Sequence, residues 1–210
     1  MTRDPHLSQS RRDFLLIGCA GLVAGCGSIL PTPMAPQLYV LRPQAPPAEN
    51  MAPVRFRLAV AVPDAPASLD TARIALTRSA TTMDYFANAA WNDRIPLMLQ
   101  RLLIQRFDAG GRITAVGRDT AGLESDYLLE TEIRDFHARY DTLDGAPEIV
   151  IGVQAKLVRM PQREIVASLN AMQMTRASSN NLDAVVIAFN QAVGAAIGQI
   201  AAWTLATPFT

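Results

Sequence analysis

The sequence predicts an α+β domain: an antiparallel sheet with two amphipathic helices packed on one face, preceded by a signal peptide and a proline-rich tether. Several segments alternate apolar and polar residues, which is the pattern of half-buried strands. Two further segments repeat apolar residues every three or four positions, as a helix that covers a core does. With 210 residues, 50% of them hydrophobic, the chain can hold one such domain and a short additional segment.

Residues 1–25 are expected to be a signal peptide. Arg11 and Arg12 stand shortly before an uncharged apolar run, residues 14–24, and this pair resembles the twin-arginine export motif. The run is shorter than the ~20 residues that a transmembrane helix needs, but it suits the apolar region of a signal peptide. The two arginines also favour a cytoplasmic amino terminus.

The apolar run ends in the pattern of a lipobox, Leu22-Val23-Ala24-Gly25-Cys26. We therefore expect cleavage before Cys26 and lipid attachment to its sulfur; the alternative is a buried amino-terminal helix that contains a cysteine. Two or more acyl chains hold a protein stably on a membrane. Gly27 stands where an aspartate would retain a lipoprotein in the inner membrane. We expect the periplasmic face of the outer membrane, rather than the inner membrane, as the location.

The remaining chain is expected to form a lipidated tether, residues 26–36, and one folded domain, residues 37–207. Prolines are frequent in residues 27–53 and keep such a segment extended. One apolar island, residues 37–41, interrupts the proline-rich segment and predicts an edge strand.

Alternating apolar residues predict the other strands of the sheet. In chain order they are residues 54–62, 73–78, 83–86, 113–116, 127–140, 149–157 and 165–171. Within the fifth of these the apolar residues change parity near Arg134-Asp135, which predicts a β-bulge. Short turns join the last three strands, so we expect them to form an antiparallel meander.

The two helices are expected over residues 93–108 and 182–205. Asp93 is the predicted N-cap of the first helix, and Gly110-Gly111 ends it. Asn180 is the predicted N-cap of the second helix. Both helices carry an apolar stripe, formed by Ile95, Leu99, Leu102, Leu103 and Phe107 in the first and by Leu182, Val186, Phe189, Val193, Ile197 and Ile200 in the second.

The carboxy-terminal helix has no charged residue after Asp183 and is long enough to cross a bilayer. Asn190 lies within it, and amides are costly in hydrocarbon, so we expect the helix to pack on the sheet instead. Gly194 and Gly198 lie one turn apart and permit close packing. They provide either a flat face against the sheet or the interface of a homo-oligomer.

The residues that usually reveal an enzyme are scarce. The 19 basic and 19 acidic residues cancel, which argues against nucleic acid as a partner, and both cysteines precede residue 27. His137 has no second histidine after residue 6 with which to build a metal site or a proton relay. Glu130 and Glu132 share one face of a strand, where a solvated face beside Arg134 is the alternative to a catalytic pair. We expect no catalysis, no metal and no cofactor.

Tyr85, Phe86 and Trp91 precede the first helix. Aromatic residues in this place form either a lid on the core or a contact with lipid or a partner, and both alternatives remain open from the sequence.

The order of these features resembles the ABC-type transport auxiliary lipoprotein family. The resemblance rests on the lipobox, the proline-containing tether, the Tyr-x-Leu strands 39–41 and 127–129, the aromatic region before an amphipathic helix, and the apolar last helix. It covers residues 37–205 and carries over only one functional residue, Cys26. The twin-arginine signal departs from the ordinary secretion signal expected of most members, which leaves the export route open.

The resemblance implies a non-catalytic, outer-membrane lipoprotein that serves an intermembrane phospholipid transport system of the MCE/Mla type. The implied partners are a mammalian-cell-entry (MCE) domain substrate-binding protein and its ABC permease and ATPase. A general outer-membrane assembly scaffold without lipid cargo is the alternative. A secreted enzyme is a third hypothesis, which the twin-arginine signal suggests.

Overall fold

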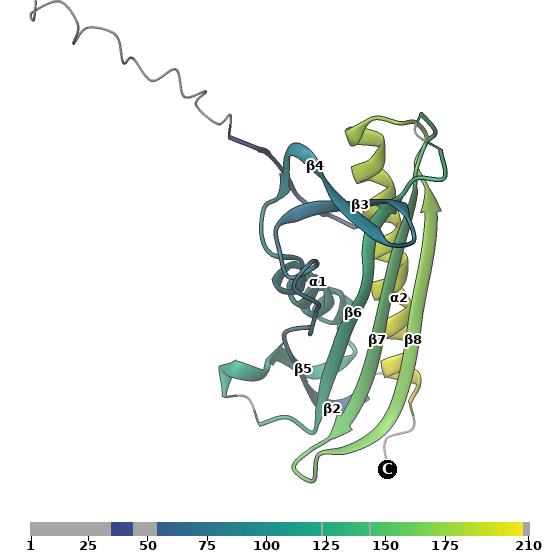
Figure 1. Ribbon diagram of the computed structural model, residues 1–210. Helices are drawn as coiled ribbons and strands as arrows, with labels where there is room; N and C mark the ends of the chain where they lie inside the picture. Colours follow the sequence, from purple (N-terminus) through teal and green to yellow (C-terminus); the bar gives the residue numbers. More distant parts are fainter. Residues whose placement is uncertain (1–34, 44–53, 123, 143, 208–210) are drawn as a thin grey trace, which may run out of the picture. The chain divides into compact units, whose positions relative to one another are not determined.

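The computed structural model describes residues 35–43, 54–122, 124–142 and 144–207 (Figure 1). The predicted signal peptide, with Arg11 and Arg12, and the predicted site of lipid attachment, Cys26, lie outside the described residues. The strands are β1 (Gln37–Tyr39), β2 (Val54–Val60), β3 (Arg73–Ser79), β4 (Thr82–Trp91), β5 (Ile113–Arg118), β6 (Tyr127–Arg139), β7 (Glu148–Arg159) and β8 (Glu164–Arg176). The helices are α1 (Ile95–Gly110), a short 3₁₀ turn (Asp119–Ala121) and α2 (Leu182–Ala206).

The long strand β6 organises the sheet. One edge of β6 pairs with β7 along its whole length, and β7 pairs with β8. The other edge is shared, because β2 pairs with its first residues, Tyr127–Leu129, and β3 pairs with its last, His137–Arg139. Strand β5 continues the sheet beyond β2, while β4 and then β1 continue it beyond β3. The described residues thus form one eight-stranded sheet, and Figure 1 shows its curled shape.

The sheet is mixed, so the prediction of an antiparallel sheet was wrong. The predicted meander is present, because β6, β7 and β8 pair antiparallel, as do β3 and β4. Four other pairs are parallel: β1 with β4, β2 with β5, β2 with β6 and β3 with β6. Parallel neighbours need a long crossover connection, and here the chain between β2 and β5 contains β3, β4 and α1. The alternation of apolar and polar residues along a strand shows which of its faces is buried. It does not show whether the neighbouring strand runs parallel or antiparallel to it, so the parallel pairs could not be predicted.

The predicted bulge in β6 is confirmed. The register with β7 shifts between Ile133 and Asp135, so that Ile133 and Phe136 both face the core although three positions separate them. Gly152 stands opposite the bulge, and a Cβ there would lie 2.6 Å from an Oδ of Asp135. The absence of a side chain at residue 152 leaves room for the displaced Asp135.

The two helices complete the core. Helix α2 packs on β7 and β8, while α1 packs against β5 and β2 and also contacts α2. Among the described residues α2 is long and apolar enough to cross a membrane, but 61% of its most apolar window is buried inside the protein. The expected packing of this helix on the sheet is therefore confirmed.

The amino terminus of α1 differs from the prediction. Its N-cap is Arg94, whose side chain makes no capping hydrogen bond, and not Asp93. Asp93 instead accepts a hydrogen bond from the backbone N–H of Arg94 and pairs with Arg101 at 3.5 Å. The carboxy terminus agrees with the prediction, because Gly111 adopts the left-handed conformation (φ 58°) that ends many helices.

The N-cap of α2 is Asn181 and not Asn180, which the sequence predicted. The side chain of Asn181 accepts a hydrogen bond from the backbone N–H of Ala184 at 2.9 Å. Asn180 is engaged elsewhere, because its side-chain oxygen accepts from the hydroxyl of Tyr140 at 3.0 Å. Two adjacent asparagines can each serve as a cap, and the contact with Tyr140 decides which one does.

Asn181→Ala is expected to lower the free energy of unfolding by about 1 kcal/mol, because it leaves one N–H at the start of α2 without its partner. Chemical denaturation followed by circular dichroism measures this change. Asn181→Asp is the matched control, since aspartate caps equally well and should retain the stability. An alanine variant as stable as the parent protein would contradict the assignment of the cap.

Candidate functional site

Trp91 lies in the centre of the core. It is 1% exposed, and its ring makes edge contacts with Phe136 at 6.2 Å and with Phe189 at 5.1 Å between ring centroids. Phe136 and Phe189 stack on each other at 5.4 Å. The three rings join β4, β6 and α2, so Trp91 holds the sheet to the helix. In this structure Trp91 offers no surface for the lipid or partner contact that the sequence suggested.

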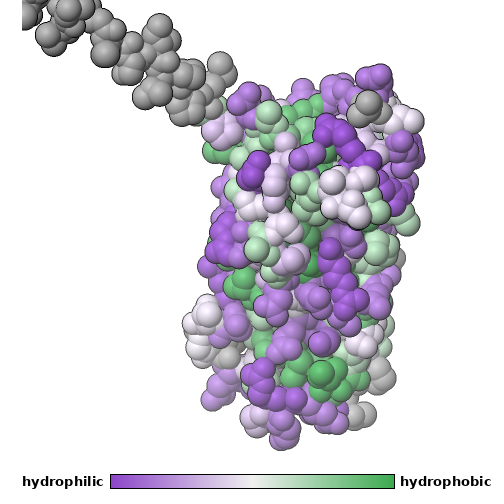
Figure 2. Space-filling view, in the orientation of Figure 1, coloured by the Kyte–Doolittle hydropathy of each residue, from purple (hydrophilic) through white to green (hydrophobic). Residues whose placement is uncertain are grey.

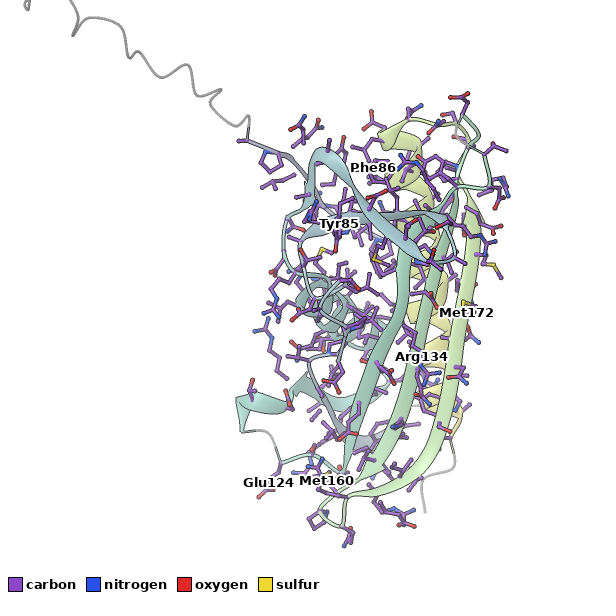
Figure 3. All side chains as sticks on the ribbon, in the orientation of Figure 1. Tyr85, Phe86, Glu124, Arg134, Met160 and Met172 are labelled. Carbon is purple, nitrogen blue, oxygen red and sulfur yellow. The ribbon has the colours of Figure 1, made fainter. Side chains whose placement is uncertain are left out.

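Tyr85 and Phe86, which Figure 3 labels in its upper part, lie on β4 and are partly exposed. The hydroxyl of Tyr85 donates to the backbone oxygen of Ser68 at 3.0 Å, and the guanidinium of Arg73 lies 3.6 Å above its ring. Phe86 packs beside Tyr140 at 6.4 Å on the core side. The structure therefore does not bring the three aromatic residues into one surface, and a contact role for Tyr85 or Phe86 stays a prediction.

His137 is half-buried at the far end of β6. It borders a hollow of about 650 Å³ between this strand and the β3–β4 turn. Its Nδ1 is buried without a hydrogen-bond partner in the described chain, and Asp135 lies 3.9 Å away. Burial lowers the pKa of His137, an effect that the charge of Asp135 opposes and that of Arg139 supports. The imidazole is therefore neutral at physiological pH.

The lowered pKa of His137 predicts a loss of stability in acid. The unfolded chain binds a proton near the ordinary histidine pKa of about 6.5, whereas the folded chain binds it only at lower pH. The contribution of His137 is thus complete above that value and is lost as the pH falls toward the folded-state pKa. Denaturation midpoints measured from pH 7.5 to 5 should fall less steeply for His137→Gln. Parallel curves for the two proteins would contradict this.

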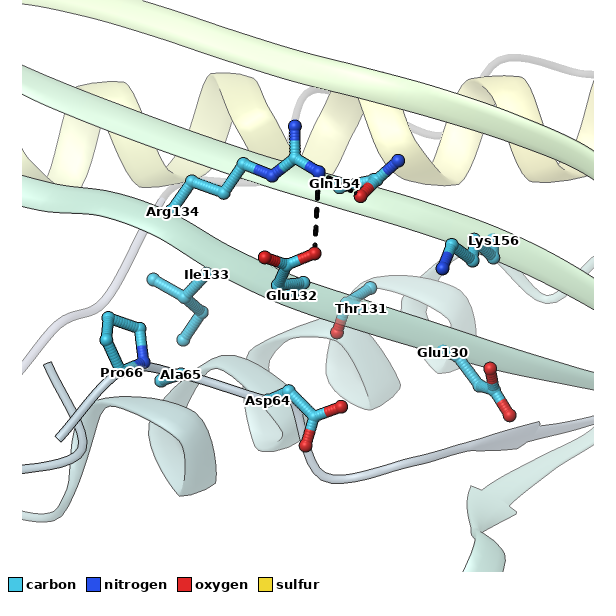
Figure 4. Close-up of a pocket in the computed structure, with 10 residues that line it drawn as sticks. All are labelled: Asp64, Ala65, Pro66, Glu130, Thr131, Glu132, Ile133, Arg134, Gln154 and Lys156. Carbon is cyan, nitrogen blue, oxygen red and sulfur yellow. Dashed lines mark hydrogen bonds and ion pairs between the residues drawn. The ribbon is translucent and has the colours of Figure 1, made fainter.

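Glu130 and Glu132 border a second hollow of about 650 Å³, on the face of β6 and β7 that is turned away from α2 (Figure 4). Glu132 pairs with Arg134 at 3.4 Å, and Arg134 also donates to the side chain of Gln154. Glu130 pairs with Arg163 at 3.1 Å. Both carboxylates thus pair with arginines, which favours the solvated face beside Arg134 over a catalytic pair.

Sequence reasoning missed two other residues that line this hollow, Asp64 and Lys156. The segment around Asp64 fills the gap between β2 and β3 along β6, because its N–H donates to Thr131 O at 2.9 Å and its oxygen accepts from Ile133 N at 2.8 Å. Within the described ranges neither Asp64 nor Lys156 forms an ion pair. The hydroxyl of Thr131 is buried there and has no hydrogen-bond partner in the part of the chain that the structure describes. The hollow can hold a polar group, and the described residues contain no group of His, Cys, Asp or Glu that could hold a metal ion.

This face of the sheet is mostly hydrophilic, with hydrophobic atoms gathered toward the lower end of the view in Figure 2. The outer side chains of β8 include three exposed apolar residues, Ile165, Met172 and Met174. A smaller apolar cluster of Ala59, Leu128 and Val158, with Met160 packed against it, lies on the same face. The described surface thus has charged hollows and scattered apolar residues.

The model of one protein family matches residues 39–201, which run from β1 to the last turns of α2 and make up well over half of the chain. That family is the ABC-type transport auxiliary lipoprotein component. The chain belongs to this family. The resemblance seen in the sequence is thereby confirmed, and the family role in transport points away from catalysis.

Solved structures support the fold of this auxiliary lipoprotein. It is similar to protein XCC0632 from Xanthomonas campestris, of the DUF330 family, with 28% identity and a TM-score of 0.76 over 81% of this chain and 95% of that one. A second crystal structure, of an uncharacterized protein, shares the fold with 17% identity and a TM-score of 0.64 over 81% and 99% of the two chains. No curated protein matches the chain.

Family membership assigns the chain to the lipoproteins that accompany ABC-type transporters. The match spans the aromatic core of Trp91, Phe136 and Phe189 as well as both hollows, so these features belong to the auxiliary domain itself. Cys26 precedes the matched segment by thirteen residues. The attachment of lipid to Cys26 therefore stays a prediction from the lipobox.

Proposed function

We propose that this auxiliary lipoprotein is the non-catalytic outer-membrane component of an ABC-type system that moves phospholipid between the inner and outer membranes. Its partners in this proposal are the MCE-domain substrate-binding protein and the ABC permease and ATPase of that system. The observation that carries the proposal is the family match over residues 39–201, together with the lipobox that ends at Cys26. A scaffold for another outer-membrane assembly, without lipid cargo, is the alternative.

The proposed anchor is the set of acyl chains on Cys26. Each methylene buried in the bilayer contributes about 0.8 kcal/mol to membrane binding, and two chains suffice to attach the protein stably to the membrane. The ten residues from Gly27 to Pro36 then span at most about 35 Å, at 3.3–3.6 Å per extended residue. This limit keeps the domain close to the leaflet and raises its effective concentration for a partner that reaches the same membrane.

The proposed location is the periplasmic face of the outer membrane. The twin-arginine pair Arg11-Arg12 or the general secretory route would export the chain, and Gly27 after the lipidated residue favours release from the inner membrane. Joining of copies of the chain into a homo-oligomer is proposed at the later turns of α2, on the side turned away from the sheet. Gly198 lies there, and an added Cβ at this position would meet nothing within 4 Å.

Deletion of the gene tests this function. Loss of the protein should alter the phospholipid distribution of the outer membrane and its permeability to detergent, and the wild-type gene should restore both. Cys26→Ser should not restore them although the domain is made. Normal phospholipid distribution, together with a defect in assembly of another outer-membrane complex, would overturn the proposal and support the scaffold.

A further inference from the structure

The edge strand β1 and the residues that follow it turn apolar side chains outward. Leu38 is 61% exposed and Val40 is 41% exposed, whereas Leu41, two positions after the strand ends, is only 4% exposed. The side chain of Tyr39 turns to the protein and joins the periphery of the core. Alternation along an extended segment thus separates Tyr39 and Leu41, which pack against the core, from Leu38 and Val40, which are exposed.

Helix α2 adds a third apolar residue to the same corner. The hydroxyl of Tyr39 donates to Asp183 at 3.4 Å, and the backbone N–H of Arg42 donates to the side chain of Asn190 at 2.6 Å. Residues 183, 187 and 190 form one stripe of the helix, because they are spaced by four and three. Ile187 therefore lies on the helix between the two contacts with the edge segment, and it is 58% exposed.

Two arginines flank these apolar side chains. Arg42 follows Val40 by two positions and is exposed. The register of the sheet places Leu38 opposite Ala90 and Ala90 opposite Arg73, so Leu38 and Arg73 stand in one cross-strand row. Arg73 is exposed and stacks on Tyr85. We call Leu38, Val40 and Ile187, with Arg42 and Arg73 beside them, the amino-terminal patch.

We propose that the amino-terminal patch docks on the lipid surface that holds the acyl chains of Cys26. The three apolar side chains would enter the interface, and the two guanidinium groups would contact lipid phosphates. This inference rests on the proposed function only through the lipid anchor. Beyond the anchor, the folded domain itself would touch the bilayer through this patch and would therefore take one orientation on the membrane.

The position of the patch along the chain selects a membrane as its occupant. Leu38 is twelve residues from Cys26, so it can lie no more than about 40 Å from the anchored residue. Tethering at this range makes a weak contact effective. A second copy is disfavoured by charge, since a two-fold interface through this patch would bring the arginine rims of both copies together. One acidic group, Asp183, lies beside the patch, but its carboxylate already accepts a hydrogen bond from the hydroxyl of Tyr39.

Single cysteines can test the contact, because the only cysteine left after signal cleavage, Cys26, is blocked by its lipid. Leu38→Cys, Val40→Cys and Ile187→Cys report on the patch. Ile165→Cys and Met172→Cys on β8 are matched controls, since the native residues are 57% and 50% exposed. Each lipidated, full-length mature protein carries a nitroxide label and is placed in vesicles of phosphatidylethanolamine and phosphatidylglycerol.

The patch labels should become several-fold less accessible to a water-soluble nickel chelate and more accessible to oxygen, while the β8 labels stay accessible to the chelate. Equal chelate access at all five positions, on protein whose lipid is verified by mass spectrometry, would overturn the inference but leave the proposed function intact. Spin–spin broadening at position 187 without a gain in oxygen access would assign the patch to a second copy and overturn it too. An unmodified Cys26 would remove the anchor, and with it both proposals.

Discussion

Trp91→Ala is expected to lower the free energy of unfolding by about 3–5 kcal/mol, the usual cost of removing a large aromatic side chain from a core. Trp91 is 1% exposed and contacts both Phe136 on β6 and Phe189 on α2. The cavity would open where the sheet meets the helix, so the surrounding rings could close it only in part. The predicted loss is a large fraction of the stability of an ordinary domain, which is about 5–15 kcal/mol.

Urea denaturation of the unlipidated mature domain, followed by circular dichroism at 222 nm, measures this effect. Trp91→Phe is the matched control: it keeps an aromatic ring in place and removes an indole N–H that has no hydrogen-bond partner in the described residues. It should cost much less than the alanine variant. A loss below about 1 kcal/mol for Trp91→Ala would mean that the ring is not part of a packed core.

Cys26→Ser is expected to move the protein from the membrane fraction to the soluble periplasmic fraction. Serine has no thiol for acylation, and without acyl chains no other predicted feature of the tether holds the chain on a bilayer. The amino-terminal patch alone is too small for stable attachment. Fractionation of cells, a carbonate wash and immunoblotting measure the distribution of the protein.

Cys19→Ser is the matched control for this prediction, because Cys19 lies within the predicted signal peptide and is removed with it. This variant should remain entirely in the membrane fraction. If Cys26→Ser protein stayed in the membrane pellet after the wash, attachment would depend on another part of the chain. Helix α2 would then be the first segment to test, since it has the length and composition of a membrane span.

Local patterns predicted the elements of the fold well. The parity change at Arg134-Asp135 located the bulge of β6, and Gly110-Gly111 located the end of α1, because each signal lies within a few residues of the feature it produces. The parallel pairs were missed because they are non-local. Leu58 pairs with Tyr127 only after β3, β4 and α1 have returned the chain to the same edge of the sheet.

The helix caps show a second limit of sequence reasoning. Asn180 and Asn181 have the same capping chemistry, and only the hydrogen bond from Tyr140, forty residues earlier, distinguishes them. Asp93 is likewise a good N-cap residue by type. The helix nevertheless begins one residue later, and the Asp93 side chain pairs with Arg101 instead.

The candidate surfaces were predictable only in part. The sequence placed Glu130 and Glu132 beside Arg134, because all three lie on one strand. It could not bring Asp64 to the edge of β6 or Lys156 to the same hollow, since these residues meet through tertiary structure. Trp91 could not be assigned to core or surface from its type alone, because aromatic residues serve in both places.

The most direct test of the central claim is to identify the proteins that accompany this lipoprotein in its own membranes. Cells that make a tagged protein from its own promoter are crosslinked, the protein is purified from solubilised membranes, and its partners are quantified by mass spectrometry against an untagged strain. We predict enrichment of an MCE-domain protein with the permease and ATPase of its transporter. Enrichment of another outer-membrane assembly, with no transporter component above background, would contradict the proposed role in lipid transport.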